Sequence, residues 1–359
     1  MTPQITHLEL PKQVSQVLRR LYEHSYNAYI CGECVRSLIR GQTPFEYSVL
    51  TDAELSRVHA IFDEDSYKLE LNADKDEIVV TVLGIALTIG SFHGSDLRTE
   101  LAMKQAFTFN AIAYSAKGGD GFGVVDYWNG VDALSRNEIA FIEEEATFNP
   151  ADILPALELY ASGEFVVSDS ANKLILTHYT RVVAAREEIE AVLMGKNARD
   201  TLCEYSDVFT TLIPELKMLE TPQVSDVDLL GQSFRSVGLS SPVLTLRYAL
   251  LLCELGKADC HSLDENGKPR YRGHLERARI YATRIMTRLG CAKRDIADTC
   301  DIISNAHHAA KAQTTNLADL RDEFSAVGLK LLVQFNIAVC RANFDEKAAM
   351  NYKKLMNLI

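Results

Sequence analysis

The sequence predicts an α+β fold in which a mixed β-sheet with helices on it is followed by an all-helical part. Alternating and β-branched apolar segments concentrate before residue 145, whereas apolar residues at helical spacing dominate after Pro150. The 359 residues, 47% of them apolar, are enough to bury more than one core. We expect three domains: a head over 1–145, a helical neck over 146–220 and a helical C-terminal domain over 221–359.

The head contains both element types. Helices are expected at 8–24, 33–41 and 52–62, the last with Asp52 as its N-cap. Strands are expected at 26–30, 47–50, 107–114 and 123–127. The stretch 67–92 is split near residues 72–75 and again at Gly84, which is typical of successive antiparallel strands.

The remaining chain shows a helical pattern in which strand signals essentially stop. Helices are expected at 152–163, 181–194, 198–205, 207–219, 242–254, 274–289, 294–307 and 316–342. Joints are expected near residue 220 and in the polar loop 259–272.

The net charge of −12 is concentrated in the N-terminal part. Residues 1–150 contain 12 Lys and Arg against 22 Asp and Glu, a net of −10; the other 209 residues contain 25 against 27, a net of −2. Proteins gain affinity for nucleic acid when Lys and Arg displace the counterions of phosphates. The acidic part therefore argues against tight binding of RNA or triphosphate there, and no DNA partner is expected.

No apolar run approaches the roughly 18 residues that a membrane span needs, and the N-terminus lacks the zones of a signal peptide. We expect a cytoplasmic protein without a membrane partner. The eight cysteines include no repeated CxxC pair of the kind that builds a structural zinc site, so reduced thiols are expected. Redox activity of Cys31 and Cys34, which spell C-G-E-C, is the alternative.

The stretch from Ala28 to Asp52 contains a motif with chemical meaning. In Ile30-Cys-Gly-Glu-Cys-Val-Arg-Ser37 a glycine turn joins a strand to a helix, where backbone N–H groups can bind phosphate. Phe45-Glu-Tyr-Ser-Val-Leu-Thr-Asp-Ala53 follows. Enzymes that add nucleotides to a 3′ end combine such a turn with two or three carboxylates that hold two Mg²⁺ ions.

These residues resemble the head domain of bacterial CCA-adding tRNA nucleotidyltransferases and their class II poly(A) polymerase relatives. The resemblance continues through Phe107-Thr-Phe-Asn-Ala-Ile-Ala-Tyr114, similar to the family's Phe-Thr-Ile-Asn-Ala stretch. Gly123-Val-Val-Asp-Tyr-Trp-Asn-Gly130 is similar to its Asp-Pro-Phe-Gly-Gly turn. The resemblance implies a nucleotidyltransferase head, a role in tRNA processing and tRNA as a possible partner.

The positions that carry the family's chemistry are substituted. Its metal-binding Asp-x-Asp reads Glu46-Tyr47-Ser48, and its third strand carboxylate falls at Thr88. By this comparison no catalytic residue is intact at Glu46, Ser48 and Thr88. No cofactor is firmly implied; Mg²⁺ is expected only for residual activity at a one-metal site using Glu46.

The nucleotide-binding positions are altered too. The second glycine of the turn is Glu33, the Arg-Arg-Asp before Phe-Thr reads Lys104-Gln105-Ala106, and the base-reading motif reads Phe148-Asn149-Pro150-Ala151-Asp152. The remaining nucleotide-binding candidates are Gly32, Arg36, Lys104, Asn110 and Asp152. The alternative for Arg36 and Asn110 is structural, with both bonded to backbone across the turn and strand.

The C-terminal domain resembles the HD-type metal phosphohydrolase-like domain found in many family members, through Leu250-Leu-Leu-Cys-Glu-Leu-Gly-Lys257 and Arg270-Tyr-Arg-Gly-His-Leu-Glu276. The resemblance implies divalent metal held by imidazoles and carboxylates. Here His-Asp reads Cys253-Glu254, and the upstream His reads Asp228. The candidate metal ligands are Cys253, Glu254, His274 and His307; the alternative is that His274 caps a helix and that His307 lies near a helix end.

We expect a catalytically silent family member, a pseudoenzyme that serves as a binding or regulatory scaffold for an unknown protein partner or a regulatory ligand. RNA binding without catalysis is one alternative, because residues 151–359 are nearly charge-balanced and contain Lys268-Pro-Arg-Tyr-Arg272. A weak nucleotidyltransferase or an altered HD-type phosphohydrolase is the other.

Overall fold

The computed structural model of the chain describes residues 7–64, 67–72, 76–92, 95–117, 123–143, 147–220, 228–306 and 324–359. The chain divides into two compact units. Unit 1 consists of Met1–Phe148 and Val166–Leu174, and unit 2 of Asn149–Phe165 and Ile175–Ile359. The expected division into head, neck and C-terminal domain stays a prediction, since its second boundary, at 220, adjoins residues 221–227, which lie outside the described ranges.

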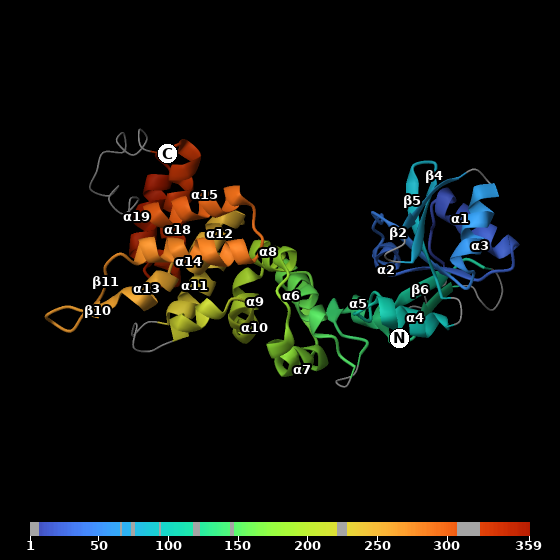
Figure 1. Cartoon of the computed structure of the whole chain (residues 1–359), viewed down its shortest axis with the longest axis horizontal. Helices are drawn as coiled ribbons and strands as arrows, with labels where there is room; N and C mark the ends of the chain where they lie inside the picture. Colours follow the sequence, from blue (N-terminus) through green and yellow to red (C-terminus); the bar gives the residue numbers. More distant parts are fainter. Residues whose placement is uncertain are drawn as a thin grey trace. The chain divides into compact units, whose positions relative to one another are not determined.

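Unit 1 is built on a seven-stranded mixed sheet (Figure 1). In spatial order its strands are β3 (Lys68–Asn72), β4 (Glu77–Val82), β5 (Ile85–Ser91), β2 (Tyr47–Thr51), β1 (Ala28–Cys31), β6 (Ile112–Ser115) and β7 (Gly123–Asp126). β2 and β5 run parallel, and all other neighbours are antiparallel. The sheet, including the three successive strands within 67–92, confirms the prediction.

The two faces of the sheet carry different layers. The helices of unit 1 are α1 (Lys12–Glu23), α2 (Glu33–Ile39), α3 (Leu55–Glu64), α4 (Leu97–Lys104) and α5 (Gly130–Ser135). Ile30 and Val49 belong to the larger core, which includes the buried residues of α1 and α3. Cys31 and Leu50, one residue further along each strand, pack with α4 instead. This alternation follows from the two-residue repeat of a strand.

The predicted start of the third helix is wrong. α3 begins at Leu55 rather than after Asp52. The Asp52 carboxylate instead accepts hydrogen bonds from the backbone N–H and the side-chain amide of Asn27, each at 2.7 Å. Asp52 therefore fastens the start of β1 to the end of β2.

The predicted strand over 107–114 is only partly correct. β6 starts at Ile112, and the preceding residues form a turn in which Phe107 pairs with Phe141 in an isolated bridge. The rings of Phe107 and Phe109 stack with centroids 5.3 Å apart. Packing of these rings explains why an apolar stretch leaves the strand pattern here.

Unit 2 is mainly helical. Its helices are α6 (Ile153–Ser162), α8 (Arg186–Met194), α9 (Ala198–Glu204), α10 (Ser206–Leu212), α11 (Leu229–Gly238), α12 (Leu244–Leu252), α13 (Leu255–Cys260), α14 (His274–Arg288), α15 (Lys293–Asn305), α18 (Ala326–Ala342) and α19 (Glu346–Met356). Helix α7 (Asp169–His178) begins in unit 1 and ends in unit 2. Short 3₁₀ turns cover Pro150–Asp152, Tyr179–Arg181 and Pro214–Glu220.

The expectation that strands stop after residue 150 is wrong in two places. β8 (Glu138–Ile139) pairs with β9 (Val166–Val167) in unit 1, and β10 (His261–Leu263) pairs with β11 (Pro269–Tyr271) within the predicted polar loop of unit 2. The helices α7, α11 and α19 were also not expected. Within the described ranges, none of the helices has the length and apolarity needed to cross a bilayer.

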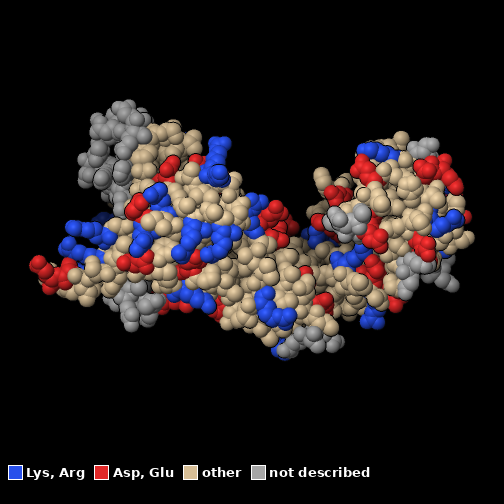
Figure 2. All heavy atoms as spheres, viewed as in Figure 1, with Lys and Arg blue, Asp and Glu red and all other residues tan. Residues whose placement is uncertain are grey.

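Lysine and arginine gather on unit 2 over α14 (Figure 2). Between residues 268 and 294 the sequence contains nine Lys and Arg but a single carboxylate, Glu276. The side chains of Arg277 and Arg284 are 50% and 61% exposed. This segment, rich in cations in a chain with a net charge of −12, is called here the α14 basic region (residues 268–294). Carboxylates from outside the segment, those of Asp259, Asp264, Glu215 and Asp298, pair with five of its arginines.

Candidate functional site

The glycine turn of unit 1 has the expected geometry but a different use. Gly32, with φ of +78°, leads from β1 into α2, a backbone conformation that favours glycine. Arg36 donates from Nη2 to Glu33 at 2.5 Å and from Nη1 to the side-chain oxygen of Asn110 at 3.0 Å. Its guanidinium also lies 5.5 Å from the centre of the Phe109 ring.

The structural alternative for Arg36 and Asn110 was therefore wrong in its details, because the two side chains bond each other rather than the backbone. Glu33, which stands where the family has glycine, supplies the counter-charge of Arg36. The guanidinium is 14% exposed, so little of it faces solvent at this turn.

The two strand positions of the family's carboxylates lie next to each other. Ser48 on β2 is paired in parallel register with Thr88 on β5, so both side chains point to the same face of the sheet. Ser48 is exposed, and Glu46, also exposed, directly precedes β2. The structure thus brings Ser48 and Thr88 together where metal ligands are expected, and they offer hydroxyls instead of carboxylates.

Lys104, at the end of α4, is held by two carboxylates. Its Nζ lies 3.3 Å from Glu77 on β4 and 3.7 Å from Glu100 on α4. A Cβ atom built at Gly90 on β5 would lie 3.4 Å from this Nζ, which places Lys104 over the same strand as Thr88. Its charge is balanced by protein carboxylates.

Gln105 comes close to the glycine turn. A Cβ atom built at Gly32 would lie 3.2 Å from Nε2 of Gln105. The family's Arg-Arg-Asp position therefore still adjoins the turn, but a neutral amide occupies it. Together, Gly32, Ser48, Thr88, Lys104 and Gln105 stand at positions that the resemblance assigns to a nucleotidyltransferase site, and Lys104 is the one charged side chain among these five.

The C-G-E-C pair is buried and unsuited to redox chemistry. Cys34 donates its thiol to the carbonyl oxygen of Cys31 at 3.1 Å. Burial raises the pKa of both thiols, and the thiolate is the reactive form. The reading of Cys31 and Cys34 as structural thiols is favoured.

The turn after β7 explains another part of the resemblance. The Asp126 carboxylate accepts hydrogen bonds from the backbone N–H groups of Trp128, Gly130 and Val131. A Cβ atom at Gly130 would overlap the carbonyl oxygen of Thr108. The hydrogen bonds of the turn thus require Asp126, and the close contact with Thr108 requires Gly130. Neither requirement depends on a reaction.

Of the residues that the resemblance places at the base-reading position, Phe148 belongs to unit 1 and Asn149 to Asp152 belong to unit 2. Asn149 caps the 3₁₀ turn by accepting from the backbone N–H of Ala151 at 3.1 Å, and Asp152 ends that turn ahead of α6. Further along α6, burial and the nearby charge of Glu188 raise the pKa of Glu158. The described residues do not test whether Asp152 contacts a nucleotide.

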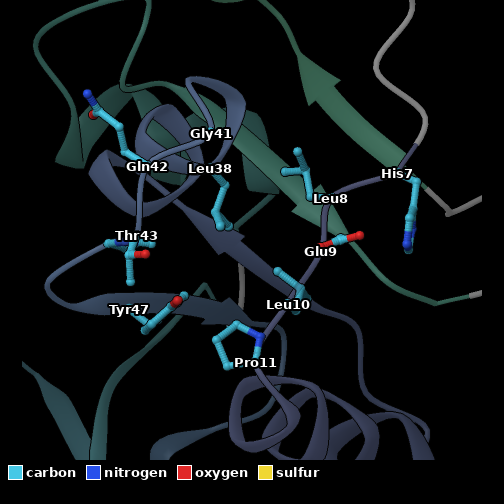
Figure 3. A pocket seen from close by; sticks show the side chains of 11 residues that line it. His7, Leu8, Glu9, Leu10, Pro11, Leu38, Gly41, Gln42, Thr43 and Tyr47 are labelled. Carbon is cyan, nitrogen blue, oxygen red and sulfur yellow. The ribbon is translucent and has the colours of Figure 1, made fainter.

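A hollow of about 500 Å³ in unit 1 lies on the opposite face of β2 from Ser48 (Figure 3). Tyr47, Leu38 and the segment His7–Pro11 line it, together with the loop after α2. Among the described lining residues there is no Lys or Arg. This composition is unlike that of a phosphate site.

In unit 2 the segment that was compared with an HD-type motif contains a largely buried ion pair. Glu254, 6% exposed, pairs with Lys257 one helical turn later. Burial acts to lower the pKa of Lys257, but the charge of Glu254 outweighs it, so the pKa is raised. Cys253 is buried, and burial raises its pKa well above the usual value. Neither the carboxylate of Glu254 nor the thiol of Cys253 is therefore presented as a free metal ligand.

Of the other candidate metal ligands, His274 lies within the described residues; it and Asp228, which stands at the upstream His position, each bond the backbone. His274 opens α14 and its Nδ1 lies 2.7 Å from the carbonyl oxygen of Tyr271, whereas Asp228 caps α11 by accepting from Gly231 at 2.8 Å. His307 lies outside the described residues. Over the part of the chain that the structure describes, no group of three or more His, Cys, Asp or Glu side chains is arranged to hold a metal ion; the four-residue site stays a prediction.

Sequence reasoning missed three residues of these sites. The sequence predicts Glu33 only as an obstacle to phosphate, whereas in the structure it pairs with Arg36. It predicts neither the contact of Glu77 with Lys104 nor the position of Gln105 beside the glycine turn. The spacing of three between Glu33 and Arg36 is a helical ion-pair signal that could have been read. The contact of Lys104 with Glu77 spans 27 residues and has no such local signal.

Comparison with known proteins agrees with this architecture. No protein-family model matches the chain. A CC-adding tRNA nucleotidyltransferase of Halalkalibacterium halodurans is 22% identical over 199 residues, 54% of this chain and 51% of that protein. A CCA-adding enzyme of Staphylococcus haemolyticus is 20% identical over 240 residues, 60% and 58% of the two chains. The chain thus matches little more than half the length of these curated relatives.

Solved structures match over more of the chain. A Thermotoga maritima CCA-adding enzyme complexed with tRNA superimposes with a TM-score of 0.68 at 15% identity, covering 97% of this chain and 83% of that one. A Bacillus stearothermophilus CCA-adding enzyme in complex with CTP gives 0.62 at 18%, covering 96% and 82%. The fold is that of a nucleotidyltransferase head joined to a helical unit. More particularly, one of these relatives is a CC-adding tRNA nucleotidyltransferase, and the other relative and both structures are CCA-adding enzymes. This similarity supports assignment to the CCA-adding nucleotidyltransferase family.

Proposed function

We propose that this chain is a catalytically silent relative of the CCA-adding enzymes that binds RNA instead of extending it. The observation that carries the loss of catalysis is the Ser48–Thr88 register. A two-metal transfer requires carboxylates at the junction of these strands, and hydroxyls are poor substitutes for them because they are neutral. With Glu46 as the sole carboxylate of the three positions, the residues do not fit a pair of Mg²⁺ ions.

The neighbouring cations support the same conclusion. Arg36 and Lys104 each pair with protein carboxylates, so their charges are compensated before any triphosphate approaches. Losing one electrostatic contact to the transition state commonly costs about 3 kcal/mol, or more than a hundredfold in rate. Loss of metal and phosphate contacts together is expected to leave no measurable transfer.

The α14 basic region supports RNA as the ligand class. It contains nine Lys and Arg within 27 residues. Several of its arginines pair with protein carboxylates, but exposed cations such as Arg272 and Lys293 can gain affinity from the release of phosphate counterions. One structural neighbour is complexed with tRNA. We extend that ligand class to this chain because its basic residues concentrate in the helical unit.

Catalysis is tested by incubating the purified full chain with tRNA, Mg²⁺ or Mn²⁺, and labelled CTP and ATP. The Halalkalibacterium halodurans relative serves as the positive control. No end-labelling is expected from this chain. Robust end-labelling would contradict the proposal that the chain is catalytically silent. If the Glu46→Gln variant lost that labelling, the activity would be assigned to a one-metal site at Glu46.

RNA binding is tested separately by gel-shift titration with tRNA at several salt concentrations. The triple variant Arg272→Gln, Lys293→Gln and Arg294→Gln removes three exposed charges of the α14 basic region. It is expected to weaken binding and to reduce the slope of log K against log salt by about 2 to 3. Removing three exposed charges from unit 1, at Arg19, Arg57 and Lys68, is the matched control, and an equal loss there would contradict the assignment.

A further inference from the structure

A cavity of about 800 Å³ opens on unit 2 beside α11, α13, β11 and the turn between α18 and α19. The polar and aromatic side chains in its lining are those of Asp228, Gln232, Arg235, Lys257, Tyr271, Asn343 and Phe344. These residues combine the groups that recognise a charged molecule with the groups that recognise a flat ring.

Gln232 gives the strongest indication of a ligand. It is 3% exposed and lines the cavity. Its backbone N–H donates to the carbonyl oxygen of Asp228 at 3.0 Å, but its side-chain amide has no hydrogen-bond partner among the described residues. The amide atoms are not among the fully buried polar atoms that lack a partner in the described residues, so the amide lies at the cavity surface, where water or a ligand can bond it. A ligand with a polar edge would supply a hydrogen-bond partner for this amide.

Two aromatic rings of the cavity stand beside cations. The guanidinium of Arg235 lies 5.6 Å from the centre of the Phe344 ring, and Nζ of Lys257 lies 5.5 Å from that of Tyr271. Phe344 is 82% exposed although it is a large apolar residue. Its φ of +59° lies in the left-handed region, which bulky side chains rarely adopt. The fold therefore holds a solvent-exposed ring at the cavity, on a residue whose backbone is strained.

The cations retain donors for an anion. Arg235 donates from Nη1 to Asp228 and from Nε to the carbonyl oxygen of Ala342, both at 3.3 Å. Its Nη2 has no described hydrogen bond. Lys257 pairs with Glu254, and an ammonium group has three N–H donors. Each cation can thus donate a hydrogen bond to a phosphate oxygen while it keeps its present partner.

We propose that this cavity binds a mononucleotide, with the base stacked on Phe344, its polar edge at the amide of Gln232 and its phosphate at Arg235 and Lys257. Bases stack on aromatic side chains regardless of sequence, and a glutamine amide can pair with the edge of a base. The proposal does not depend on RNA binding by the α14 basic region, and either can fail without the other.

The test is a calorimetric titration of the full chain with AMP, GMP, CMP and UMP. At least one is expected to bind with a Kd of about 1 mM or tighter. Phe344→Asn removes the ring but suits the left-handed backbone, and Gln232→Leu removes the amide but keeps the volume. Each is expected to weaken binding about tenfold while the melting temperature stays equal or rises, a combination that a purely structural role does not produce.

Met350→Ala, which shortens a 52% exposed side chain outside the cavity, is the matched control and should bind as the parent does. Absence of binding up to about 5 mM of each mononucleotide would overturn the proposal, as would unchanged affinity in both cavity variants. Inorganic phosphate binding as tightly as the best mononucleotide would also refute recognition of a ring. A hexanucleotide that alone shows the loss in Phe344→Asn would reassign the cavity to RNA strands.

Discussion

The guanidinium of Arg36 donates from Nη1 to the side-chain oxygen of Asn110 at 3.0 Å, across 74 positions of sequence. Arg36→Met is expected to destabilise unit 1 by about 1–2 kcal/mol, because it leaves the partly buried Asn110 oxygen without its donor. Chemical denaturation followed by circular dichroism measures the change. Arg19→Met is the matched control: Arg19 is 69% exposed in its pair with Glu23, and its loss should cost less than about 0.5 kcal/mol. Equal effects would show that the Arg36 contact is no stronger than a surface pair.

Restoring carboxylates should create a metal site. In Glu46→Asp, Ser48→Asp, Thr88→Asp the three positions again carry the ligand type that binds Mg²⁺ and Mn²⁺. At tenfold excess over its Kd a metal ion stabilises the folded state by about 1.4 kcal/mol, so a thermal shift with Mn²⁺ is expected for the triple variant and none for the parent. A shift in the parent that Glu46→Gln removes would instead reveal a metal site already present.

The buried Glu215 should make unit 2 sensitive to acid. Arg288 binds both carboxylate oxygens at 2.7 and 2.8 Å and, with further help from Arg284, lowers the pKa of Glu215 to about 2. A lowered pKa stabilises the fold above the ordinary value of about 4.5, and this contribution is lost as the pH falls from 4.5 towards 2. Because both arginines are substantially exposed, the screened contribution is about 1–2 kcal/mol at pH 7.

Glu215→Gln should therefore lower the melting temperature at pH 7, and the difference from the parent should shrink below pH 4.5. Glu276→Gln, which breaks an exposed pair with Arg279, is the control and should have little effect at either pH. A difference that stays constant down to pH 3 would contradict the assigned pKa.

Gly256 should be required for packing rather than for metal chemistry. A Cβ atom there would overlap the carbonyl oxygen of His274, where α13 meets α14. Gly256→Ala is expected to cost about 2–3 kcal/mol through overpacking. Gly328→Ala, near the start of α18, meets only the flexible Ser325 hydroxyl at 3.3 Å, and should be neutral or stabilising. Similar melting temperatures for the two variants would refute the overlap.

The elements that sequence reasoning recovered are those whose burial leaves a periodic trace. The three strands within 67–92 were predicted as a group, and the middle one, Glu77–Val82, alternates in burial at every residue. Helix α19 was missed because only Ala349 and Tyr352 of its residues are buried, too few to produce an apolar stripe. The β10–β11 hairpin was missed since its turn is held by Asp264, which accepts from the backbone of Asn266 and Lys268, rather than by an apolar pattern.

The candidate site was predictable in place but not in detail. Motif order located Gly32, Ser48 and Thr88, because strand register follows from the same apolar pattern that defines the sheet. The pairing of Lys104 with Glu77 depends on how α4 crosses the sheet, which no local spacing encodes. For Asp52, local sequence predicts the wrong role. Its position suits a helix cap, but in the structure both of its carboxylate oxygens accept hydrogen bonds from the non-local residue Asn27.

The register of Ser48 and Thr88 also sets how many changes a two-metal site would need on these strands. A single substitution by aspartate at either position would place one carboxylate beside a hydroxyl, which is insufficient for a pair of metal ions. If the chain is catalytically silent, as we propose, selection for transfer would gain nothing from the first of these changes. Two adjacent positions would have to change together before two-metal chemistry could be selected.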